Sequence, residues 1–101
     1  MPLPWWPVER IETEKRRLEM LRRLAEEPGY ELAISLLRDH CRRVGVPTTA
    51  DQAAAAAAWL DEASLVTVRV ERAEPILRVT RAGREVADGA RVVPGVLRPD
   101  P

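Results

Sequence analysis

The residues of this chain best suited to metal or nucleophilic chemistry stand side by side in Asp39-His40-Cys41. The histidine and the cysteine are each the single residue of its type. Adjacent residues of a helix point in different directions, so His40 and Cys41 are poorly placed to chelate one ion together. A zinc site also needs more ligands than one His and one Cys supply. We therefore expect no metal site, with Cys41 a small core residue and His40 at the helix surface or boundary.

Catalysis finds no support elsewhere in the chain. A lone histidine without a matching serine or cysteine nucleophile makes no triad, and no glycine-rich phosphate loop is present. The acidic residues sit in charge patterns typical of helix surfaces. We expect neither an enzyme nor a bound cofactor.

Nucleic-acid binding is the chemistry that the spacing of the remaining polar residues favours. Thr49 and Gln52 begin a helix expected from Thr48 to Glu62, and glutamine and threonine side chains can contact base edges. Thr48 and Asp51 are expected to form a capping box at its start. Further arginines are expected to contact the DNA backbone, namely Arg42, Arg43, Arg69 and Arg72. Against this interpretation, the helix carries three acidic residues and no basic one.

The elements that must position these residues follow in a recognisable order. Apolar residues at helical spacing predict a first helix over Glu9–Glu27, with Ile11, Leu18, Leu21, Leu24 and Ala25 on its inner stripe. A short strand over residues 30–32 and a helix over residues 33–44 come next. That second helix should turn Leu36, Leu37, Cys41 and Val44 inward.

Gly45 suits the left-handed residue that ends the second helix. The third helix, rich in alanine, should bury Ala53, Ala57 and Leu60, leave Ala54, Ala55 and Ala58 outside, and place Ala56 near the boundary. Two strands, residues 65–71 and 76–79, follow with a turn over 72–75. A last helix over residues 81–88 is capped by Thr80 and stopped by Gly89. The order predicts an α+β, mostly α fold, a winged helix-turn-helix with a two-stranded β wing.

The chain is expected to form one domain over residues 9–90, because 101 residues bury one modest core. Residues 1–8 form a Pro- and Trp-rich arm, and residues 91–101 form an extended tail that lies on the domain or on a second subunit. The N-terminus has no signal-peptide pattern and no stretch is long enough to span a membrane. A cytoplasmic protein of a bacterial host cell is therefore expected. The formal net charge of zero argues against strong nonspecific DNA binding and favours self-association.

Several short segments together resemble a family of small proteins from Mu-like phages and prophages, labelled winged-helix or ArsR-like transcriptional regulators. The resemblance covers roughly residues 16–101 and rests on the joint order of these segments: Pro28-Gly29-Tyr30, Ser35-Leu36-Leu37, Trp59-Leu60-Asp61-Glu62-Ala63-Ser64-Leu65-Val66, Thr80-Arg81-Ala82-Gly83, and Val93-Pro94-Gly95-Val96 with Arg98-Pro99. It implies a winged-helix fold and a phage context. Family members tend to carry Arg near Ala54, a larger apolar residue near Ala57 and often Gly at Ser64, and this sequence departs from all three.

Two functions follow as hypotheses. The first is a DNA-binding transcriptional regulator with double-stranded DNA as its partner, dimeric through the first helix and the terminal segments. The alternative is a degenerate winged helix that acts as a protein-interaction or assembly module. In that case the contact surface would include Trp5, Trp6 and Trp59. Trp59 is expected to pack against the wing strands, with a dimer contact as the other possibility.

Overall fold

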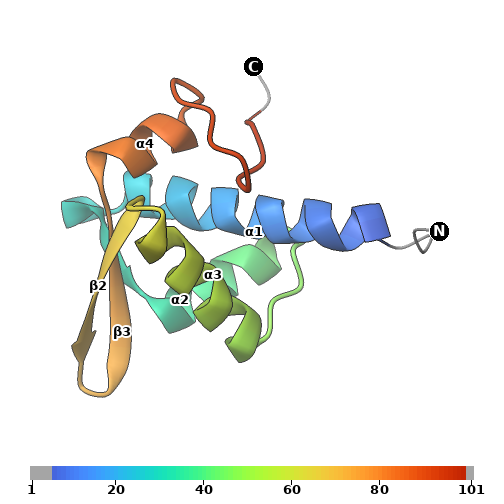
Figure 1. Cartoon of the computed structure of the whole chain (residues 1–101). Helices are drawn as coiled ribbons and strands as arrows, with labels where there is room; N and C mark the ends of the chain where they lie inside the picture. Colours follow the sequence, from blue (N-terminus) through green and yellow to red (C-terminus); the bar gives the residue numbers. More distant parts are fainter. Residues whose placement is uncertain (1–5, 100–101) are drawn as a thin grey trace.

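The computed structural model describes residues 6–99 as a mostly helical α+β fold, which confirms the predicted α+β, mostly α class. Four helices combine with one antiparallel three-stranded sheet (Figure 1). In chain order the elements are α1 (Trp6–Glu26), a 3-10 turn (Pro28–Tyr30), β1 (Glu31–Ala33), α2 (Ile34–Arg43), α3 (Ala50–Glu62), β2 (Val66–Glu71), β3 (Glu74–Val79) and α4 (Arg81–Ala87).

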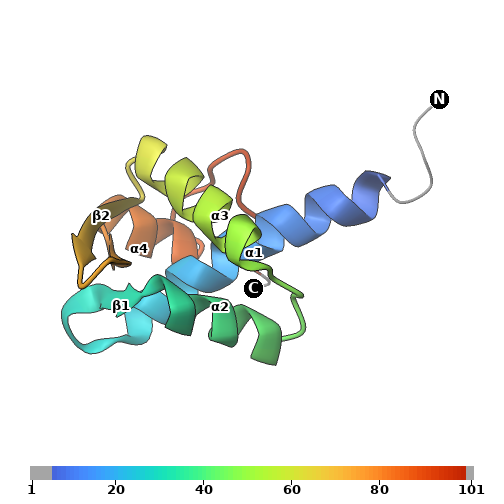
Figure 2. The same cartoon turned by 90° about the horizontal axis from the view of Figure 1, so that it is seen from below.

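The long helix α1 is the central support against which the other helices pack. It begins at Trp6, three residues before the expected Glu9, and it ends where Pro28 and the left-handed Gly29 (φ 74°) interrupt helical geometry. Leu18, Leu21 and Leu24 are buried as predicted. The prediction for Ile11 is wrong, because this side chain is 49% exposed. It lies in the N-terminal part of α1, which projects beyond the other elements (Figure 2).

Helix α2 buries only a narrow side. Leu37 and Cys41, four residues apart, are fully buried, whereas Leu36 and Val44 are 50% and 39% exposed. The inward placement of Leu36 and Val44 was therefore a wrong prediction. Leu36 is rotated by one residue from the buried row, and Val44 already lies at the C-terminal cap. Gly45 follows with φ 86°, the left-handed conformation expected of it.

Alanine side chains let α3 pack closely on the core. Ala53, Ala57 and Leu60 are buried as predicted, and Ala56, expected near the boundary, is 5% exposed and so also buried. The outer face carries the three alanines that were predicted to lie there: Ala54, Ala55 and Ala58.

The sheet has the strand order β1-β3-β2, so β2 is an edge strand. The register pairs Leu77 with both Leu32 and Val68, which places these three side chains on one face. Near the helices this face belongs to the core, while toward the turn the β2–β3 hairpin extends past the body (Figure 1). The second hairpin strand was expected to begin at Ile76, but pairing already starts at Glu74.

Helix α4 and the segment after it close the structure. Thr80 caps α4 by accepting a hydrogen bond from the Gly83 amide at 3.1 Å, as predicted. The tail then returns along α1 (Figure 1). Val96 is 7% exposed, and the Leu97 amide donates to the Glu14 carbonyl at 3.2 Å. Of the two placements expected for the tail, the structure shows packing on the domain. None of the helices in residues 6–99 combines the length and the apolar character needed to cross a membrane.

Candidate nucleic-acid interface

The loop that leads into α3 is fixed by a buried arginine of α1. Arg16 is only 4% exposed, and it donates to the Thr48 hydroxyl at 3.0 Å and to the Pro47 carbonyl at 2.7 Å. The Thr48 hydroxyl in turn donates to the Val46 carbonyl at 2.9 Å. Thr48 is therefore occupied inside the loop, and the prediction that it caps α3 with Asp51 is wrong.

The capping box of α3 is instead formed by the two residues predicted to read DNA bases. The Thr49 hydroxyl accepts from the Gln52 amide at 3.1 Å, and the Gln52 side-chain oxygen accepts from the Thr49 amide at 2.9 Å. A guanidinium nitrogen of Arg16 also lies 3.4 Å from that oxygen. Pairing of Gln52 with adenine requires both its oxygen and its amide nitrogen, so base contact would compete with the cap.

Two of the arginines predicted to contact the DNA backbone remain available at the end of α2. Arg42 and Arg43 are exposed in the last turn of the helix, where positive charge interacts favourably with the helix dipole. The described residues provide no ion-pair partner for either side chain. Arg38, one turn earlier, is engaged with the Thr48 carbonyl at 3.0 Å.

The positive charge of Arg69 on the hairpin is compensated by two carboxylates. Its guanidinium lies 3.0 Å from a carboxylate oxygen of Glu71 and also contacts Glu31. Arg78 lies 3.7 Å from the other oxygen of Glu31. The hydrogen bond from Arg69 lowers the pKa of Glu31, against a smaller opposing effect of desolvation. Arg69 is thus a weak candidate for phosphate, because binding would displace partners it already has.

Arg72 stands at the tip of the hairpin. It is exposed, and it forms the two-residue turn with Ala73 at φ 51° and 64°. Positive φ at both central positions is the pattern of a type I′ turn, whose twist matches the flanking strands. Together with Arg42 and Arg43, it completes a set of exposed cations on the elements before and after α3. The exposed face of α3 itself carries acidic charge from Asp51, Asp61 and Glu62.

Trp59 lies on α1 and the tail rather than on the wing strands, which corrects that expectation. The guanidinium of Arg17 sits 4.0 Å from the centre of the Trp59 ring. A side chain at Gly95 would come within 2.4 Å of the same ring, so the tail passes directly against it. Trp5 lies outside the described residues, and Trp6 is the first residue of α1.

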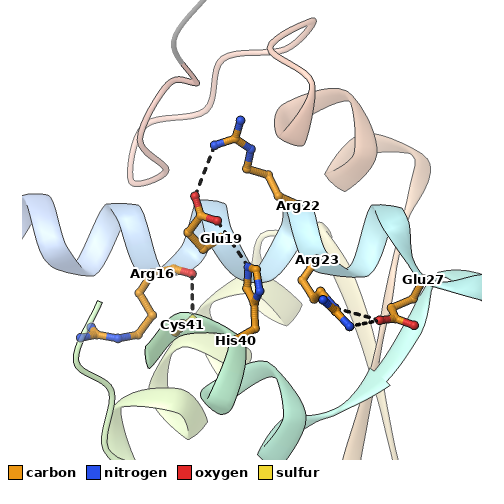
Figure 3. A network of polar contacts seen from close by, with 7 residues as sticks. All are labelled: Arg16, Glu19, Arg22, Arg23, Glu27, His40 and Cys41. Carbon is orange, nitrogen blue, oxygen red and sulfur yellow. Dashed lines mark hydrogen bonds and ion pairs between the residues drawn. The ribbon is translucent and has the colours of Figure 1, made fainter. Parts of the chain in front are cut away.

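The Asp39-His40-Cys41 segment contributes to helix packing. Nε2 of His40 lies 3.4 Å from a carboxylate oxygen of Glu19, which also pairs with Arg22 at 3.3 Å (Figure 3). Burial raises the pKa of the Cys41 thiol to about 11. Within residues 6–99, no three His, Cys, Asp or Glu side chains are grouped in a way that could hold a metal ion.

Arg16 is the most important residue that sequence reasoning misassigned. The sequence predicts surface pairs of Glu12 with Arg16 and of Glu19 with Arg23. Instead Arg16 points into the loop before α3, and Arg23 pairs with Glu27 at 2.7 Å (Figure 3). One signal was present: Arg16 stands four residues before Met20, which is fully buried, in a row that continues to Leu24.

The sequence relationship that decides the family is with a phage protein. Over 91 residues the chain is 37% identical to the uncharacterized protein gp26 of Escherichia phage Mu, covering 90% of this chain and 94% of the Mu protein. The chain belongs to the family of Mu gp26. The expected relation to Mu-like phages is thereby confirmed. No protein-family model matches the chain, and no solved structure matches it.

Proposed function

We propose that this member of the Mu gp26 family is a winged helix-turn-helix regulator that binds double-stranded DNA mainly through its phosphate backbone. The order of α2, a tight turn, α3 and the β2–β3 hairpin supports the fold assignment. In such a fold α3 enters the major groove while the hairpin reaches the neighbouring backbone. The phage relationship provides a context in which a small regulator of transcription would act.

The observation that carries this proposal is the set of exposed, unpaired guanidinium groups on both elements that flank α3. Arg42 and Arg43 lie at the end of α2, and Arg72 lies at the hairpin tip. Each can neutralise a phosphate without first losing an ion pair within the described residues. Backbone contacts of this kind position a protein on DNA but carry no direct sequence information.

Side chains that already hold hydrogen bonds or ion pairs within the protein limit how well DNA bases can be read. Thr49 and Gln52 hold the capping box, and Arg69 is neutralised by Glu31 and Glu71. The alanine face of α3 can touch thymine methyl groups only through weak apolar contacts. We therefore expect modest affinity, low discrimination among sequences and strong sensitivity to salt.

A salt titration with a labelled duplex tests the proposal. Neutralisation of three phosphates predicts that the logarithm of the association constant falls with the logarithm of the salt concentration with a slope of about −2.7. A variant with Arg42→Glu and Arg43→Glu should make the slope shallower, at about −0.9, and should weaken binding at low salt by at least about tenfold. Arg98→Glu is the control, because this exposed arginine lies on the tail and outside the proposed footprint. If the two charge-reversed proteins bind alike, this footprint is wrong.

A second function, protein interaction, is favoured by a separate observation. The outer face of α3 combines alanines with acidic residues, and the hairpin exposes Val68 (37%) and Val70 (68%). Exposed apolar side chains on a projecting hairpin suit contact with another protein. If no duplex binds even at low salt, we would assign a protein-interaction role to this protein. Capture of a phage or host partner should then be lost in Val70→Lys and kept in Val92→Lys.

A further inference from the structure

A small cleft between α1 and α3 is lined by two guanidinium groups and by no carboxylate. Its volume is about 140 Å³. A group of the size of phosphate or sulfate fits a volume of this order. The lining residues are Thr13, Arg16, Arg17, Gln52, Ala55 and Ala56.

Both arginines of the cleft are held in place by neutral groups. Arg16 is 4% exposed and uses Nε and one terminal nitrogen on Thr48, Pro47 and Gln52. Its other terminal nitrogen makes no hydrogen bond to any residue in 6–99. Arg17 donates from Nη1 to the Gly95 carbonyl at 2.8 Å and stacks on Trp59.

Arg17 also carries an unfulfilled donor. Its Nε is buried and lacks a hydrogen-bond partner within the described part of the chain. A buried donor without a partner has a substantial desolvation cost. Burial lowers the pKa of the Arg17 guanidinium; the nearby Glu14 carboxylate opposes this change, and the charge of Arg16 adds to it.

The cleft therefore holds two guanidinium groups that form no ion pair within the described residues. Neither Arg16 nor Arg17 takes part in a salt bridge with the described residues, whereas more exposed arginines such as Arg23, Arg69 and Arg91 do. Buried charge is costly unless it is paired. We propose that the α1–α3 cleft binds one small oxyanion, phosphate or sulfate in size, through Arg16, Arg17 and the Thr13 hydroxyl.

The surroundings set the size and chemistry of this ligand. The larger hollow next to the cleft shares Thr13 and Arg17 and is also lined by Arg10, Glu9 and Glu14, so its two guanidinium groups already have two carboxylates beside them. A single anionic group satisfies the cleft, and a longer polyanion would meet these glutamates. The proposal is independent of DNA binding, because none of the cleft residues belongs to the Arg42, Arg43 and Arg72 footprint.

A tethered carboxylate provides the sharpest test. Ala55 is exposed and lines the cleft, so Ala55→Glu should place its carboxylate beside the two guanidinium groups. Ala54→Glu is the matched control on the same helix, with nearly the same position in the helix dipole and outside the cleft. We expect Ala55→Glu to melt several degrees higher than Ala54→Glu.

Inorganic phosphate is then the probe for the site, at constant ionic strength. At about ten times its dissociation constant it should raise the melting temperature of the unmodified protein and of Ala54→Glu by several degrees. Ala55→Glu should show only the smaller rise that phosphate causes in any protein by exclusion from its surface. Equal phosphate stabilisation in all three proteins would overturn the site.

Nuclear magnetic resonance supplies a measurement that does not depend on stability. The Nε–H signal of Arg17 should shift saturably with phosphate, and Arg17→Gln should weaken phosphate binding by at least about tenfold. In that variant the phosphate response is read from the Thr13 and Ala55 amides. Arg98→Gln, which alters an exposed arginine of the tail, should bind as the unmodified protein does. A signal of Arg17 that does not move, or moves without saturation, would contradict the proposal.

Discussion

Arg16 shows how much of this fold depends on one polar side chain. It reaches from the middle of α1 to the loop before α3 and joins the Thr48 hydroxyl, the Pro47 carbonyl and the capping residue Gln52. The planar guanidinium makes these contacts in several directions at once, which a lysine ammonium cannot reproduce. The position of α3 relative to α1 is therefore set by hydrogen bonds as well as by alanine packing.

Substitution of Arg16 by lysine tests this role at the residue scale. The buried Thr48 hydroxyl and the Pro47 carbonyl would lose part of their donors, so we expect a loss of about 1 to 3 kcal/mol in the free energy of unfolding. Urea denaturation measures the difference. Arg22→Lys, which changes an exposed arginine paired with Glu19, should change stability by less than about 0.5 kcal/mol. Equal effects of the two substitutions would show that Arg16 has no special structural role.

At the scale of elements, the β2–β3 hairpin combines a favourable turn type with unfavourable residues. Arg72 and Ala73 both adopt positive φ, a conformation that glycine and asparagine tolerate best. The remaining support comes from strand pairing and from the Arg69 contacts with Glu31 and Glu71. The hairpin therefore keeps backbone strain at its tip, where it projects from the core.

Ala73→Gly should relieve part of this strain. We expect a gain of about 0.5 to 1 kcal/mol in the free energy of unfolding, because the left-handed conformation costs glycine little. Thermal unfolding followed by circular dichroism measures the change. Ala58→Gly, at an exposed position of α3 with ordinary helical geometry, should lose about 1 kcal/mol. Destabilisation by both glycines would mean that the turn is not strained.

At the scale of the whole molecule, the tail makes the two ends of the chain interdependent. Residues 92–99 run beside α1, where Val96 is buried and the Leu97 amide binds the Glu14 carbonyl. Gly95 touches Trp59 of α3 and accepts a hydrogen bond from Arg17 of α1. The tail is thus part of the core that joins α1 and α3.

The contribution of the tail can be measured with two similar substitutions. Val96→Ala removes buried methyl groups and should cost about 1 to 3 kcal/mol. Val92→Ala changes a side chain that is 63% exposed, and should cost less than about 0.5 kcal/mol. Chemical denaturation of both variants gives the comparison. Equal stabilities would indicate that the tail lies on the surface without support from the core.

Most of the elements could be predicted from the sequence because local signals define them. Pro28-Gly29 ends α1, Gly45 ends the turn after α2, and Thr80 and Gly89 bound the last helix. Each of these signals depends on the backbone preferences of a few adjacent residues. The inner row of α3 was likewise predicted correctly from its spacing alone.

The predictions that were wrong concern residues whose position depends on distant parts of the chain. Both Thr48 and Thr49 are suitable caps. Gln52, three residues after Thr49, completes the capping box, and Arg16 holds the Thr48 hydroxyl inside the loop. The predicted position of Trp59 was wrong because this side chain contacts Gly95, a residue far away in the sequence. Arg69 likewise contacts Glu31, which lies far from it in the sequence, whereas the capping box of Thr49 and Gln52 is a local pattern.

Cys41 gives this protein a built-in reporter of core opening. It is the single cysteine of the chain, it is fully buried, and burial raises the pKa of its thiol to about 11. A thiol-directed dye will therefore react only when α1 and α2 separate. The rate of labelling reports these openings without any engineered residue. A cysteine placed on the hairpin would be labelled at once. The two thiols therefore distinguish exposure at the surface from transient opening of the core.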